Sequence, residues 1–194
     1  QGAIKLLEDI YKNSQGKKHV LLIGHSHAGQ LFSILSTLCY DKRIKKELLL
    51  ILSKHGRPLP KNLNHMLEHY KELKLDFVTL GTPSRYPWTL GPNMRLLHFI
   101  NHRADTPLGG DLPGVLITKS GDYIQQWGVA GSDIKSPLLI EQNINTDLDK
   151  ILGKGSDFET LKLNVQQRER LHKEGHHLLI DYGDNGLIPN FALT

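Results

Sequence analysis

A serine stands between two histidines and two small residues in the segment Gly24-His25-Ser26-His27-Ala28. A serine hydroxyl is a weak nucleophile, so it must be exposed to a base and to a carbonyl substrate at the same time. A sharp turn from a strand into a helix exposes it in this way, and the turn needs small residues two positions before and after the serine. Gly24 and Ala28 occupy those positions, which predicts that Ser26 is a catalytic nucleophile.

The residues on either side of the turn predict the strand and the helix. Residues 19–23 are a short, nearly continuous apolar run, typical of a strand buried on both faces in a parallel sheet. After the turn, apolar residues have helical spacing at Leu31, Ile34, Leu35 and Leu38. The N-terminus of that helix would point at the turn, so we expect the backbone N–H of His27 to stabilise an oxyanion. An ordinary loop before a helix is the alternative; a phosphate-binding loop is disfavoured, because no lysine stands at the helical end of the turn.

The rest of the chain alternates predicted strands with predicted helices, which favours an α/β fold. The helices are expected over about 2–13, roughly 42–54 and after Pro60, and the strands over 77–80, 95–100 and 177–182. We therefore expect one partial domain, 1–194, built as a three-layer sandwich around a mostly parallel central sheet. Residues 106–173 are expected to form an irregular, lid-like insertion.

Two segments resemble the lipase and esterase members of the α/β-hydrolase superfamily. They are His19-Val-Leu-Leu-Ile-Gly-His-Ser-His-Ala-Gly29, around the predicted nucleophile, and Phe77-Val-Thr-Leu-Gly-Thr-Pro83, which looks like the strand that follows the nucleophile helix. The resemblance implies hydrolysis of a carboxylic ester through an acyl-enzyme and a Ser-Asp-His triad. It also implies a small-molecule ester or lipid-like substrate and no cofactor.

The chain order in this superfamily is nucleophile, acid, histidine, so the acid should follow the strand over 95–100. Asp105 lies just past that strand and is the expected acid. Asp133 is the alternative acid if residues 123–129 are the relevant strand. If Asp105 is the acid, as the chain order predicts, its carboxylate should lie closer to Ser26 than that of Asp133.

The histidine of the triad should follow the last strand, but residues 183–194 contain no histidine. The base is therefore expected beyond Thr194, with His176 or His177 as the alternatives inside the chain. Those two should lie at the amino end of their strand, roughly 15–20 Å from the nucleophile. The superfamily also places several strands before the nucleophile, whereas one helix precedes Ser26 here. The chain thus resembles the C-terminal two-thirds of a hydrolase, and we expect its first strands to be missing.

The turn should direct the side chains of His25 and His27 to either side, away from the position of a general base. We expect His25, Tyr86 and Trp88 to line a substrate pocket, with simple packing under a long loop as the alternative for the two aromatic residues. A metal site built on His25 and His27 is disfavoured, because no carboxylate or cysteine has ligand spacing near them.

Composition narrows the function classes further. The 194 residues are 39% hydrophobic and 23% charged, which is typical of a globular domain, and 24 basic against 20 acidic residues leave a net charge of +4. Such a small excess does not favour a nucleic-acid partner. The single cysteine, Cys39, predicts a buried thiol rather than a disulfide. No apolar run is long enough for a membrane span and no leader is visible, so a cytoplasmic protein is expected.

The alternative function is a non-catalytic, hydrolase-like binding module or an inactive fragment. Oligomeric state and acyl specificity stay open at this point.

Overall fold

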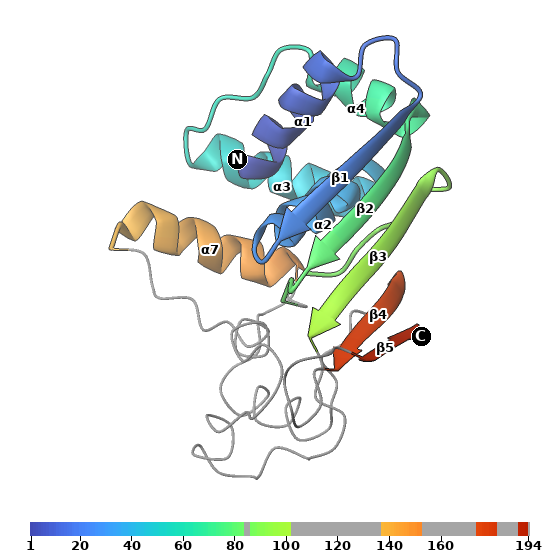
Figure 1. The fold of residues 1–194 in the computed structure, drawn as a ribbon. Helices are drawn as coiled ribbons and strands as arrows, with labels where there is room; N and C mark the ends of the chain where they lie inside the picture. The colour runs from blue at the N-terminus through green and yellow to red at the C-terminus, as the bar shows by residue number, and fades with distance from the viewer. Residues whose placement is uncertain (84–85, 102–136, 153–173, 182–189, 194) are drawn as a thin grey trace, which may run out of the picture.

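A five-stranded sheet with the strand order β1-β2-β3-β4-β5 forms the centre of the fold (Figure 1). The computed structural model describes residues 1–83, 86–101, 137–152, 174–181 and 190–193. The four parallel strands are β1 (His19–His25), β2 (Lys74–Leu80), β3 (Met94–Asn101) and β4 (His176–Asp181). An antiparallel strand, β5 (Asn190–Leu193), pairs with β4. The predicted α/β class with a mostly parallel sheet is confirmed.

Five described helices pack on one side of this sheet (Figure 1). They are α1 (Gly2–Asn13), α2 (Ala28–Tyr40), α3 (Lys42–Lys54), α4 (Leu63–Glu72) and α7 (Leu139–Leu152). Helix α2 lies directly against β1 and β2, and α1, α3 and α4 pack around it. The predicted helices over 2–13 and 42–54 are confirmed. None of the described helices is long and apolar enough to cross a membrane.

The two faces of the sheet differ in burial. Along β2, Leu75 and Phe77 are buried against the helices, as the period-two alternation of a strand requires. On the opposite face of β1, Leu21 is 55% exposed and Ile23 is 62% exposed. The described ranges therefore form two layers, not the three that the apolar run over 19–23 predicted. That run has the composition of a strand covered on both faces, but only one described layer covers it.

The connection from β2 to β3 contains no helix in its described part, and a tryptophan fills the space instead. Trp88 is 5% exposed and packs edge-on against Phe77, with ring centroids 5.4 Å apart. The Thr37 hydroxyl of α2 donates a hydrogen bond to the Pro87 carbonyl at 3.3 Å. This loop therefore covers the sheet where a crossover helix would normally lie.

Helix α7 lies inside the expected lid-like region of 106–173, whose stretch 140–173 has a mainly helical or loose sequence pattern, and it packs on α3. Asp147 of α7 accepts hydrogen bonds from Lys54 at 2.8 Å and from His55 at 3.2 Å. Strand β5 lies where the sequence predicted a loop. Residues 106–136 and 153–173 lie outside the described residues.

Candidate active site

Ser26 is the one described residue other than glycine with a positive φ, at 54°. It stands between the end of β1 and the start of α2, at the carboxyl edge of the parallel strands. The left-handed conformation is costly for a residue with a Cβ, so the surrounding structure must hold it in place. The predicted strand-to-helix turn is thus confirmed, with Ser26 at its apex and half-buried.

Hydrogen bonds to the end of β2 and to the residues that follow it hold the turn in place. The N–H of Ser26 donates to the carbonyl of Leu80 at 2.9 Å, and the hydroxyl of Thr82 donates to the carbonyl of Ser26 at 2.8 Å. Gly81, between those two residues, also has a positive φ, at 57°. The segment Gly81-Thr82-Pro83, which carried half of the family resemblance, therefore braces the serine turn.

Close contacts with neighbouring side chains explain why the residues around the turn are small. A Cβ on Gly24 would lie 2.6 Å from Cε2 of Phe32, one turn into α2. A Cβ on Gly29 would clash with the side chain of Thr82. Glycine at these two positions allows β1, α2 and the Thr82 segment to approach one another as closely as the turn requires.

One histidine lies within hydrogen-bond distance of the Ser26 hydroxyl. The Ser26 Oγ and the His27 Nδ1 are 3.2 Å apart, so the prediction that the turn directs His27 away from the serine is wrong. The αR conformation of His27, with φ −63° and ψ −17°, folds its ring back beside the preceding residue. The His27 ring is exposed, and so is that of His25.

Helix α2 begins directly after His27, its N-cap residue, and no side chain caps it. The first N–H groups of a helix have no acceptor within the helix, and they carry the positive end of its dipole. The N–H of Gly29 donates to the Ser26 carbonyl at 3.3 Å and that of Gln30 to the His27 carbonyl at 3.0 Å, so the donors that follow Ser26 directly in sequence are the N–H groups of His27 and Ala28. An oxygen that becomes negative there would meet backbone donors and a favourable field.

Both alternative bases on β4 lie far from Ser26, but not for the predicted reason. The strand register aligns Gly24 with Thr79, Thr79 with His98 and His98 with His177. His177 is therefore level with the carboxyl end of β1 instead of at a distant amino end. Its distance from Gly24 is lateral, three strand spacings or about 14 Å. His176, its neighbour, is exposed.

A buried polar row that was not predicted runs across the covered face of the sheet. The Thr79 Oγ1 and the His98 Nδ1 lie 2.5 Å apart, and the His98 ring stacks on that of His177 at 5.3 Å. The side chains of Thr79 and His98 are 1% exposed. This row ties β2, β3 and β4 together below the carboxyl edge.

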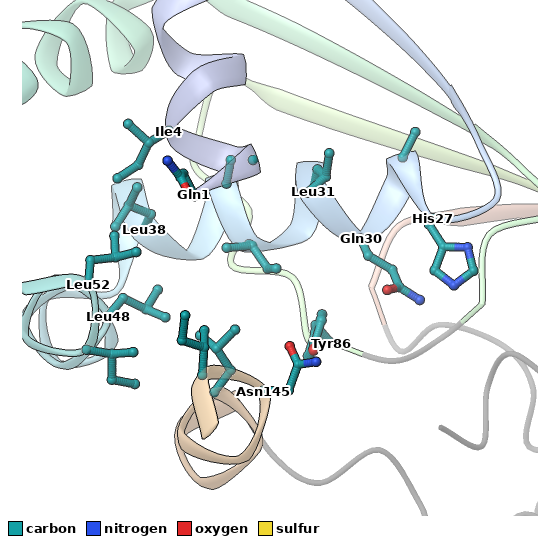
Figure 2. Close-up of a pocket in the computed structure, with 17 residues that line it drawn as sticks. Gln1, Ile4, His27, Gln30, Leu31, Leu38, Leu48, Leu52, Tyr86 and Asn145 are labelled. Atoms are coloured by element: carbon teal, nitrogen blue, oxygen red, sulfur yellow. The ribbon is translucent and has the colours of Figure 1, made fainter. Parts of the chain in front are cut away.

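An apolar pocket of about 590 Å³ opens beside the turn, with His27 and Gln30 of α2 in its wall (Figure 2). Tyr86 lines this pocket, and its role in binding a substrate stays a prediction. Trp88 belongs to the hydrophobic core, which agrees with the alternative that it simply packs under the loop. His25 is absent from the lining.

The two candidate acids, Asp105 and Asp133, lie outside the described residues, so their distances to Ser26 stay predictions. The described residues contain no group of three potential metal ligands. Burial raises the pKa of the Cys39 thiol to about 12, which keeps it protonated and inert at neutral pH.

Comparison of the chain with protein-family models, with curated proteins and with solved structures gave no match. The geometry around Ser26 is therefore the basis for inferring a function.

Proposed function

We propose that the protein is a serine hydrolase of carboxylic esters, with an α/β-hydrolase-like domain and Ser26 as the nucleophile. One observation carries the proposal. Ser26 holds a left-handed backbone conformation, with φ 54°, between a parallel strand and the N-terminus of a helix. Strain of this kind persists where the structure over-determines it, and it is typical of a nucleophile at a strand-to-helix turn.

The reaction would proceed in two halves. The Ser26 Oγ bonds to the ester carbon while its proton passes to a base, and the carbonyl electron pair moves onto oxygen. The N–H groups at the start of α2, that of His27 first, hold this oxyanion. Its collapse breaks the bond to the alcohol, which leaves with the proton. Water then adds by the same route and releases the carboxylic acid.

The base of the proposed triad is a histidine oriented by Asp105, with Asp133 as the alternative acid. His27 lies within reach of the Ser26 hydroxyl, but its ring is exposed. Among the described residues, no carboxylate pairs with that ring, and such a pair would fix its tautomer and stabilise its charged form. We therefore assign His27 to the wall of the site and to the oxyanion donors rather than to proton transfer.

Fluorophosphonate labelling tests the nucleophile directly. The protein expressed from its complete gene should react with a fluorophosphonate probe, and peptide mapping should place the adduct on Ser26. The Ser26→Ala variant should lose the label. Ser53→Ala is the matched control, because Ser53 is exposed on the outer helix α3 and has a normal backbone conformation. An adduct elsewhere, or none in a folded protein, contradicts the proposal.

The second candidate is a hydrolase-like module that binds a ligand without cleaving it. The pocket beside Ser26 favours this candidate as well, since binding requires the pocket but no base. Ligand binding with no adduct at Ser26 would support it.

A further inference from the structure

The pocket beside Ser26 runs along the face of α2 that points away from the sheet. Helices α1, α3 and α7 form its other walls (Figure 2). Most of the lining is aliphatic and comes from all four helices: Ile4, Leu31, Ile34, Leu38, Leu48, Ile51, Leu52, Ile144 and Leu148. No Asp, Glu, Lys or Arg side chain lines it within the described part of the chain.

The shape of the pocket suits a long, narrow ligand. Its lining follows α2 from His27 to Leu38, a distance of about 16 Å at the rise of an α-helix. The volume of about 590 Å³ falls in the range of small-molecule sites. Figure 2 shows Gln30, Tyr86 and Asn145 toward the His27 end, whereas Leu38, Leu48 and Leu52 lie toward the other end, where Gln1 lies beside Ile4.

Gln30 is the unusual member of this lining. Its side chain is 8% exposed, and its Nε2 has no hydrogen-bond partner among the described residues. The amide points from α2 toward the space between His27 and Tyr86 (Figure 2). A buried donor without an acceptor is unfavourable, so an oxygen supplied by a ligand would satisfy it.

We propose that this pocket binds a single fatty acyl chain, with its carboxyl or ester carbonyl oxygen accepting a hydrogen bond from Gln30 Nε2. The alkyl chain lies along α2 toward Leu38 and Leu52, where the lining is aliphatic. Gln30 lies in the first turn of α2, and His27, the residue after Ser26, lines the same pocket, so an acyl group bound here has its polar end toward the serine turn. In that respect the inference rests on the proposed function and names the substrate class of the same site.

Binding is measured in the Ser26→Ala variant, so that hydrolysis cannot remove the ligand. Displacement of cis-parinaric acid should rank saturated fatty acids by length, with about fourfold tighter binding per added methylene until the pocket is full. Gln30→Leu should weaken dodecanoate binding by about ten- to a hundredfold, because it removes a hydrogen bond to a carboxylate. Its thermal midpoint should not fall, because the change removes an unsatisfied buried donor.

Two tryptophan variants on α7 separate pocket filling from general damage. Leu148→Trp, inside the pocket, should reduce dodecanoate affinity at least tenfold. Leu139→Trp makes the same change on the same helix at a side chain that is 70% exposed, and it should leave affinity unchanged.

The outcomes distinguish the two proposals. If no fatty acid displaces the probe, or if Leu148→Trp and Gln30→Leu bind like the parent variant, the pocket proposal is overturned, whatever Ser26 does. If fatty acids bind as expected but fluorophosphonate does not label Ser26, the acyl site stands and the hydrolase proposal fails.

Discussion

The backbone of Ser26 has a strained, left-handed conformation. With φ at 54°, the residue is held by its N–H bond to Leu80 and by the Thr82 hydroxyl. Glycine adopts this conformation without the steric cost, so Ser26→Gly should raise the free energy of unfolding by about 1 kcal/mol. The same change in mid-helix, Ser33→Gly, should lower it by about 1 kcal/mol. Urea unfolding of both variants measures the difference; a destabilised Ser26→Gly would mean that the turn is not strained.

His27 tests whether proximity alone makes a base. Its Nδ1 lies 3.2 Å from the Ser26 Oγ, yet the ring is exposed. We expect His27→Gln to lower kcat/KM for a p-nitrophenyl ester by less than tenfold in the protein expressed from its complete gene. Loss of a general base would lower it by about 10²–10⁴. A loss in that range would transfer the role of base to His27.

The packing of α2 against β1 depends on the absence of a side chain at position 24. Gly24→Ala would bring a Cβ to within 2.6 Å of the Phe32 ring, a contact that must be relieved by movement. We expect the free energy of unfolding to fall by about 1–3 kcal/mol. The double variant with Phe32→Leu should be more stable than the sum of the two single changes predicts, because the smaller side chain makes room. Additive effects would show that the clash lies elsewhere.

Helix α7 is attached to α3 by a charge cluster that should titrate in acid. Hydrogen bonds from Lys54 and then His55 lower the pKa of Asp147 to about 2. A lowered folded-state pKa stabilises the fold above the ordinary carboxyl pKa near 4, and that stabilisation disappears as the pH falls toward 2. Asp147→Asn should therefore lower the urea midpoint at pH 6 and leave it unchanged at pH 2. Glu72→Gln, on the exposed end of α4, should show no such pH dependence.

At the scale of the whole molecule, the sequence pattern predicted those features that depend on residues close together in the chain. The serine turn follows from one strand, one helix and the small residues Gly24 and Ala28, and the helix over 42–54 begins where Asp41 caps the N–H of Ile44 at 2.8 Å. Features set by distant partners were missed. Strand β5 forms by pairing with β4. Gln30 lines a pocket only because α1, α3 and α7 form the other walls around it. The level of His177 depends on where β4 begins relative to β3, which no spacing within one strand reveals.

These 194 residues alone are not expected to catalyse ester hydrolysis. Ser26 lies at one edge of the described sheet, and His177 lies three strand spacings away, 8% exposed and stacked on His98. His27 is adjacent to the serine, but nothing described orients its ring as a triad carboxylate does. The described residues thus offer Ser26 no base of the triad kind, and we expect the 194-residue polypeptide to hydrolyse p-nitrophenyl acetate no faster than its Ser26→Ala variant. Circular dichroism checks that both are folded. Ser26-dependent turnover above that background would contradict the prediction, and loss of this turnover in His27→Gln but not in His177→Gln would identify the base.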